Sequence, residues 1–238
     1  LLDEIYNKFD NVEENTDDDE RIKVAIIGKP NAGKSSLVNK ILGEERVIVS
    51  DIAGTTRDAI DSYFENSYGK YVFIDTAGIR RKNKVYDVLE KYSVLKAKAA
   101  IDRANVCLLI IDATEGVTEQ DEKIAGIAHE AGKGIIIIVN KWDLVEKTTN
   151  TMSVYKKRVY EKLAYLSYAP IIFISAITGK RVDNIFEKIN EVNKQNSLRV
   201  PTGLLNDTLA EAVAITQPPS DKGRRLKVYY MTQVSIRP

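Results

Sequence analysis

The sequence lacks several features that would point to an extracellular, membrane or histidine-metal protein. Its single cysteine, Cys107, cannot form an internal disulfide and lies within the apolar run Val106–Ile111, so we expect it to pack in the core. With His129 as the only histidine, a histidine-based metal site is excluded, and we expect this residue on a helix surface. No apolar run reaches the length of a membrane span, and no charged segment precedes an apolar core as in a signal peptide. We therefore expect a cytoplasmic protein without a membrane partner.

Charge is unevenly distributed, although the formal net charge is only +1. Residues 1–20 hold nine acidic residues and one basic residue, whereas the remainder holds 34 basic and 25 acidic ones. An acidic run of this kind is typical of a solvated linker. The basic remainder permits an RNA partner without identifying one.

From Arg21 onward, short apolar segments alternate with segments of helical periodicity, which predicts an α/β fold with a mostly parallel six-stranded sheet flanked by helices. The expected strands are Ile22–Ile27, Ser62–Glu65, Tyr71–Ile74, Val106–Ile111, Ile135–Val139 and Ile171–Ile174. The expected helices are Lys34–Leu42, Asp87–Arg103, Glu119–Ala131, Val154–Leu166 and Asn184–Asn193. In such folds ligands bind at the carboxyl ends of the strands.

The two ends of the chain differ from this pattern. Residues 1–20 combine a helix-like apolar spacing with a polar stretch, and we interpret them as the end of an upstream domain and a linker. Residues 21–197 form the predicted α/β domain. Residues 198–238 predict a helix, Leu204–Ile215, and a strand, Lys227–Ile236, which together are too few for an independent core. This last segment is therefore expected to be the start of an incomplete second domain.

A phosphate-binding loop is predicted between the first strand and the first helix, where Gly28–Ser35 reads GKPNAGKS. Backbone N–H groups of such a loop surround phosphates, Lys34 reaches the β- and γ-phosphates, and Ser35 ligates Mg²⁺. The alternative is a chance glycine-rich turn, against which the flanking strand and helix argue. The predicted nucleotide contacts in and beside the loop are Asn31, Ala32, Gly33, Lys34, Ser35 and Ser36.

Two further segments are predicted to face the γ-phosphate. Asp75-Thr76-Ala77-Gly78 follows a strand, so Asp75 is expected to hold Mg²⁺ through water and the Gly78 N–H to sense the γ-phosphate. A threonine of the aperiodic segment Gly54–Asp58, assigned as Thr56, is expected to complete the Mg²⁺ shell when GTP is bound. The alternative for this segment is a polar loop.

Base recognition is predicted from Asn140-Lys141-Trp142-Asp143, which follows the strand Ile135–Val139. The Asp143 carboxylate accepts two N–H bonds from guanine, a donor pair that adenine does not offer. The Lys141 stem covers the base in this interpretation. Ser175-Ala176 follows the next strand and is expected to place a backbone N–H on the guanine carbonyl.

Together these segments resemble the Era and TrmE group of GTPases, and more closely the second GTPase domain of the bacterial double-GTPase family Der (EngA). The closer resemblance rests on Val47-Ile48-Val49-Ser50, Ala53–Asp58, Glu90–Ser93, Ala128–Lys133 and Asn140–Asp143, and in the tail on Leu205–Asp207 and Arg225–Tyr230. It implies that residues 198–238 begin a KH-like domain. Two departures are Ala32, where many members have valine, and Ile177, where lysine is usual.

The resemblance also implies a function. It implies a GTPase, converting GTP to GDP and phosphate, that acts in assembly of the large ribosomal subunit. The implied partners are that subunit with its rRNA and a first GTPase domain of the same full-length chain, and the implied state is a monomer. A nucleotide-gated RNA-binding module with incidental hydrolysis, or a tRNA-modification GTPase of the same group, are the alternatives.

The catalytic residues are less plain than the binding residues. Many GTPases position water with a glutamine after the Asp-x-x-Gly motif, but Ile79 occupies that position, and Arg57 is the candidate arginine finger. The family resemblance implies a K⁺ ion instead, held by Asn31 and by loop oxygens. The implied loop ligands are Ser50, Ile52 and Thr55, and the implied catalytic set is Lys34, Thr56, Gly78 and Asn31.

Overall fold

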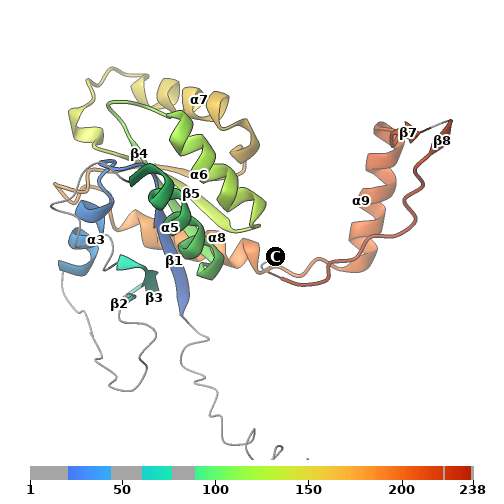
Figure 1. Cartoon of the computed structure of the whole chain (residues 1–238), viewed down its shortest axis with the longest axis horizontal. Helices are drawn as coiled ribbons and strands as arrows, with labels where there is room; N and C mark the ends of the chain where they lie inside the picture. The colour runs from blue at the N-terminus through green and yellow to red at the C-terminus, as the bar shows by residue number, and fades with distance from the viewer. Residues whose placement is uncertain (1–20, 44–60, 77–88, 222, 237–238) are drawn as a thin grey trace, which may run out of the picture. The chain divides into compact units, whose positions relative to one another are not determined.

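The computed structural model describes residues 21–43, 61–76, 89–221 and 223–236. The chain divides into two compact units, one up to Asn193 and one from Lys194 onward, and each is described by itself. Figure 1 shows the strands of the first unit surrounded by helices. None of the described helices combines the length and the apolar character needed to cross a bilayer.

The first unit is built on a sheet in the order β2-β3-β1-β4-β5-β6. All neighbouring pairs are parallel except β2 and β3, which form an antiparallel hairpin. This confirms the predicted α/β class and the mostly parallel six-stranded sheet. The strands are β1 Ile22–Ile27, β2 Ser62–Asn66, β3 Gly69–Ile74, β4 Val106–Asp112, β5 Gly134–Asn140 and β6 Ile171–Phe173.

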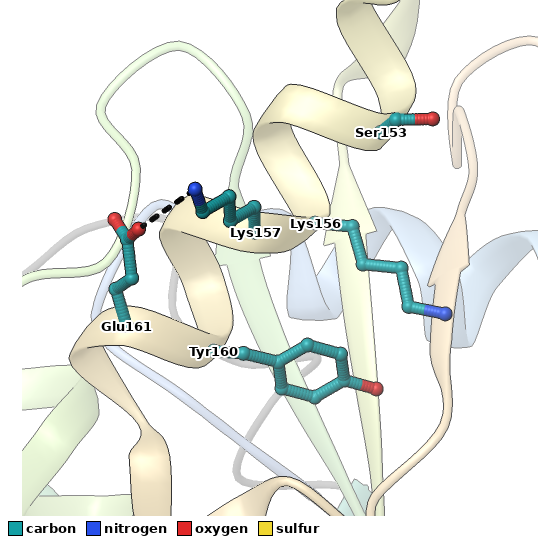
Figure 2. Close-up of a pocket in the computed structure, with 5 residues that line it drawn as sticks. All are labelled: Ser153, Lys156, Lys157, Tyr160 and Glu161. Carbon is teal, nitrogen blue, oxygen red and sulfur yellow. Dashed lines mark ion pairs between the residues drawn. The ribbon is translucent and has the colours of Figure 1, made fainter.

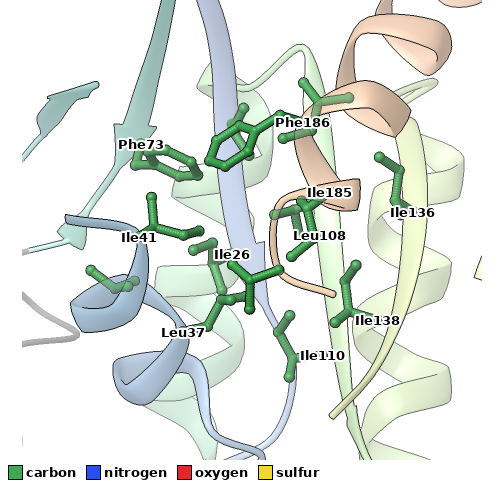
Figure 3. Close-up of a cluster of buried hydrophobic side chains, with 14 of the residues drawn as sticks. Ile26, Leu37, Ile41, Phe73, Leu108, Ile110, Ile136, Ile138, Ile185 and Phe186 are labelled. Carbon is green, nitrogen blue, oxygen red and sulfur yellow. The ribbon is translucent and has the colours of Figure 1, made fainter. Parts of the chain in front are cut away.

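Helices cover both faces of this sheet. They are α3 Lys34–Gly43, α5 Leu89–Arg103, α6 Glu119–Glu130, α7 Thr151–Lys162 and α8 Asn184–Asn196, with short 3₁₀ helices η1 Trp142–Leu144 and η2 Ala164–Leu166. Alternate residues of β4 serve opposite faces. Leu108 and Ile110 pack with residues of α3 and α8, as Figure 3 shows, whereas Cys107 and Leu109 pack with residues of α5 and α6. Two apolar layers thus fix the sheet, and Cys107 is buried in one of them as expected.

Helix ends differ from the sequence prediction where burial decides the backbone. The helix expected over Val154–Leu166 begins at Thr151 and ends at Lys162, and Leu163 then leaves the helical region with φ −110° and ψ 51°. Leu163 and Leu166 are both fully buried, so the break directs two leucines three positions apart into the core. The helix expected over Asp87–Arg103 is described from Leu89 onward. His129 lies exposed on α6, as expected.

The second unit contains α9 Thr202–Ile215 and a short antiparallel pair, β7 Ser220–Asp221 with β8 Arg224–Arg225. The strand predicted over Lys227–Ile236 is wrong, because these residues form no strand in the structure. Side-chain amides hold this segment instead: Asn206 bonds both backbone groups of Met231, and Gln233 bonds Val200 N–H and Leu198 O. An alternating segment forms a strand only where a neighbouring strand supplies backbone hydrogen bonds, and the two described strands of this unit, β7 and β8, pair with each other instead.

Candidate functional site

The predicted site residues that the structure describes lie in four segments at the carboxyl ends of strands. The segments are 28–36 after β1, 75–76 after β3, 140–143 at the end of β5, and 175–176 after β6. The buried side chain of Asn140 joins three of them. Its Nδ2 donates to Ala32 O at 2.9 Å, and its Oδ1 accepts from Ala176 N–H at 2.9 Å. Residues more than 100 positions apart are thereby held at one edge of the sheet.

The loop after β1 has an unusual backbone. Gly33 has φ +96°, and a Cβ placed there would lie 2.1 Å from Asn140 Nδ2, so only glycine fits. Lys34, the first residue of α3, donates from Nζ to Gly28 O at 2.7 Å and to Lys29 O at 2.5 Å. Its ammonium therefore lies over the loop. Asn31 is exposed with φ +63°, and Ser35 is exposed in the first turn of α3.

Hydrogen bonds with Asp61 and Ser62 hold the turn after β3. Asp75 has φ +54° and donates its N–H to Asp61 Oδ1 at 2.9 Å. The adjacent Thr76 hydroxyl lies 2.6 Å from the Ser62 hydroxyl. Asp61 in turn forms an ion pair with Arg103 of α5. These contacts fix the backbone of Asp75 at the strand end, on the strand next to the phosphate-loop strand.

At the end of β5, Lys141 adopts φ +59° and its Nζ donates to Asp112 Oδ2 at 2.5 Å. Burial alone raises the pKa of Asp112, but the bonds from Lys141 and Thr114 more than offset it and hold this pKa below its usual value. Trp142 is buried against Phe173, with ring centroids 4.4 Å apart, and Asp143 stays exposed. The packed tryptophan thus anchors a segment whose carboxylate is accessible.

Of the remaining predicted residues, some are described by the structure and the others lie outside the described residues. Ser175 and Ala176 are buried after β6, where Ser175 Oγ accepts from Thr178 N–H. Ser36 is half-buried in α3. Outside the described residues lie Ser50, Ile52, Thr55, Thr56, Gly78, Arg57 and Ile79, so their assigned roles stay predictions.

The structure also adds residues that the sequence analysis did not single out. Asp112 ends β4, one strand over from β5, so its position after a buried strand was a usable signal. Asp121 is fully buried and forms a capping box with Thr118 at the start of α6. The Thr118-x-x-Asp121 spacing was readable as such a box. Lys29, inside the loop, is buried. Its N–H donates to Asp121 and its ammonium donates to Glu115, in the segment between β4 and α6.

Two surface hollows lie outside these segments. Figure 2 shows one of about 450 Å³ on α7, lined by Ser153, Lys156, Lys157, Tyr160 and Glu161. Within it Lys157 and Glu161 form an ion pair at 3.9 Å. The other, of about 610 Å³, lies along α6 beside Tyr165. Neither is lined by a residue of the four segments, so neither belongs to the candidate site at the strand ends.

Comparison with known protein families gives the class. A family model described as "50S ribosome-binding GTPase" matches residues 23–141, and one described as "KH-domain-like of EngA bacterial GTPase enzymes, C-terminal" matches residues 199–238. The chain belongs to the family of 50S ribosome-binding GTPases.

Among its relatives are proteins named GTPase Der. That of Acetivibrio thermocellus is 62% identical over 238 residues, and that of Alkaliphilus oremlandii is 58% identical over the same length. Each alignment covers 100% of this chain and 54% of the relative, so the chain spans about half the length of these relatives. The resemblance to the Der family, stated above from sequence motifs, is confirmed.

Solved structures agree with this class. Era in complex with MgGDPNP and nucleotides 1506–1542 of 16S ribosomal RNA is 34% identical, with a TM-score of 0.55, covering 73% of this chain and 57% of that one. A variant of Aquifex aeolicus Era bound to GDP·AlF₄⁻ is 35% identical, with a TM-score of 0.54 and the same coverage. Both are GTP-site complexes of proteins with this fold.

Proposed function

We propose that this chain binds GTP and hydrolyses it to GDP and phosphate, as a switch in assembly of the large ribosomal subunit. The observation that carries the proposal is the double hydrogen bond of Asn140, which joins the phosphate loop to both base-side segments. A site that joins these three segments suits a molecule with a phosphate end and a base end. Family membership and the Era complexes support the same ligand.

The residues present fit a nucleotide with Mg²⁺. A loop with no side chain at Gly33, the Lys34 ammonium and the amino end of α3 suit phosphate oxygens. In the proposal, Ser35 and Asp75, with Thr56, hold Mg²⁺, which when bound neutralises charge on the β- and γ-phosphates. The described residues contain no cluster of three acidic, histidine or cysteine ligands. This accords with an ion that keeps waters and phosphate oxygens as most of its ligands.

Specificity for guanine comes from Asp143 in this proposal. The exposed carboxylate accepts from two N–H groups of the guanine edge, while Lys141 lies along the base and the Ala176 backbone faces the guanine carbonyl. An adenine base would leave the carboxylate without those donors.

Hydrolysis needs positive charge near the γ-phosphoryl, and Ile79 offers no polar group. We assign this role to Lys34, to the Gly78 N–H and Thr56, and to K⁺ held by Asn31 with Ser50, Ile52 and Thr55. When bound, K⁺ would supply a further positive charge beside the γ-phosphoryl. The exposed, left-handed position of Asn31 in the loop is compatible with a ligand role.

The proposed partner is the large ribosomal subunit with its rRNA, and the acting protein is a cytoplasmic monomer with a further GTPase domain upstream. In this arrangement residues 21–197 are the GTPase domain, residues 198–238 begin the KH-like domain, and residues 1–20 are the end of the upstream domain and the acidic linker. The basic charge outside residues 1–20 suits rRNA.

The test uses the full-length protein with purified large subunits. We expect phosphate release from GTP but not from ATP, and co-sedimentation with the subunits that is stronger in GTP than in GDP and falls as salt rises. Subunit binding without measurable GTP hydrolysis would instead favour the RNA-binding module. Hydrolysis with no subunit binding in either nucleotide would remove the ribosomal role.

A further inference from the structure

Lys29 is a charged residue of the phosphate loop whose side chain is only 8% exposed, whereas Lys34 in the same loop is half-buried. Its Nζ donates to Glu115 Oε2 at 2.7 Å, in the segment that links β4 to α6. A buried ammonium is costly without a partner, so this carboxylate compensates its charge. The side chain therefore contacts the segment between β4 and α6.

The backbone of Lys29 is held by the same region. Its N–H donates to Asp121 Oδ1 at 3.4 Å, and Asp121 is fully buried. Asp121 Oδ2 also accepts from Thr118 N–H at 3.1 Å and from the Thr118 hydroxyl at 2.7 Å. One carboxylate thus caps α6 and fixes the start of the phosphate loop.

The third contact of Lys29 leads to the site itself. Its carbonyl accepts a hydrogen bond from the Lys34 ammonium at 2.5 Å. Lys29, which α6 and Glu115 hold in place, therefore accepts a hydrogen bond from Lys34, the phosphate-binding lysine. Any shift of Lys29 moves an acceptor of Lys34.

We propose that Lys29 is a positioning residue that, through Glu115 and Asp121, keeps the phosphate loop and Lys34 in the shape that retains nucleotide. The linker before α6 and the first turn of α6 thereby set the rate at which GDP leaves. This inference rests on the proposed GTP site, and it assigns to Lys29 no contact with the nucleotide.

The experiment measures GDP release from the full-length protein by chasing a fluorescent GDP analogue with excess GDP, alongside the melting temperature without nucleotide. Removing the buried cation in Lys29→Gln is expected to speed release roughly three- to tenfold, the net size of one ordinary hydrogen bond, because the partner carboxylate is largely exposed to water. Glu115→Gln is expected to speed it by a smaller factor, because the Glu115 side chain is 58% exposed.

Two further variants separate positioning from general stability. Lys29→Arg keeps the cation and is expected to restore release to within about twofold of wild type. Glu119→Gln, an exposed change in the first turn of α6, is the matched control and is expected to leave release unchanged. Release equal to wild type in both Lys29→Gln and Glu115→Gln overturns the inference, as does faster release that Lys29→Arg does not restore.

The wild type in the same assay distinguishes the two levels of the argument. If wild type binds the GDP analogue and the variants release it at the wild-type rate, only the positioning role fails. If wild type does not bind it, the proposed function fails. Should Lys29→Gln not fold, the Glu115→Gln result decides. The Glu115 side chain lies at the surface, so this change leaves no altered group in the core.

Discussion

Replacing Gly33 with alanine tests the architecture of the site directly. The new Cβ would lie 2.1 Å from Asn140 Nδ2, and the residue would have to keep φ +96°. Real side chains do not tolerate such an approach, so either Asn140 or the loop must move. A shift of Asn140 breaks its hydrogen bonds to Ala32 and Ala176, and a shift of the loop breaks the bond to Ala32.

The magnitude follows from these contacts. An unfavourable φ costs on the order of 1–3 kcal/mol, and each buried polar group left without a partner costs roughly 1–3 kcal/mol. Taking the low end for the backbone of Gly33 and for the two partners of Asn140 gives about 3 kcal/mol. The altered loop can relax when GDP is absent and must regain this shape to bind GDP, so the cost falls on binding. Since each 1.4 kcal/mol is tenfold, GDP affinity is expected to fall by about 100-fold.

The assay is titration calorimetry of GDP, with urea unfolding followed by circular dichroism. Gly126→Ala is the control, because a Cβ at that position in α6 meets nothing within 4 Å. Alanine there is expected to raise the free energy of unfolding by up to about 1 kcal/mol and to leave GDP affinity unchanged. Wild-type GDP affinity in Gly33→Ala would refute the geometry on which the site is built.

Three other changes probe separate parts of the site. Asp143→Asn is expected to weaken GTP and favour xanthine nucleotides in competition binding; unchanged GTP affinity would remove Asp143 from base recognition. Phosphate release is expected to be faster in KCl than in NaCl at matched ionic strength, and Asn31→Ala to abolish that difference while GDP still binds; equal wild-type rates would rule out the K⁺ site. Because the folded-state pKa of Asp112 is lowered, its contribution to stability is present above the unfolded pKa and is lost as pH falls through the folded pKa. Urea unfolding at pH 5 and pH 3 should therefore show a steeper acid loss for wild type than for Asp112→Asn, and parallel losses would contradict the Lys141 pairing.

Local patterns predicted most of the fold because each strand and helix carries its own signal. Five-residue apolar runs such as Ile135–Val139 are interpretable without their neighbours, and the phosphate loop has a fixed spacing of glycine, lysine and serine. The strand expected over Lys227–Ile236 failed for the converse reason, since a strand depends on a partner that sequence alternation does not contain. The helix predicted to run through Leu163 failed because burial outweighed helical periodicity.

The candidate site was predictable in its parts but not in its connections. Asn140 was assigned to the nucleotide from its motif, yet its described bonds join Ala32 and Ala176, which are 108 and 36 positions away. Lys29 was passed over because nothing local distinguishes a buried lysine from a solvated one. Its burial depends on Glu115 and Asp121, contributed by a segment more than 80 residues later.

Trp142 gives the base-side segment a spectroscopic property of its own. It is the only tryptophan in the sequence, and it stands between Lys141 and Asp143. Its indole is buried, tilted against Phe173 and edge-on to Tyr155 at a centroid distance of 5.3 Å. All tryptophan emission from this chain therefore originates within one residue of the proposed guanine contacts. Occupancy of the site can accordingly be followed by the intrinsic fluorescence of the chain, without a labelled nucleotide.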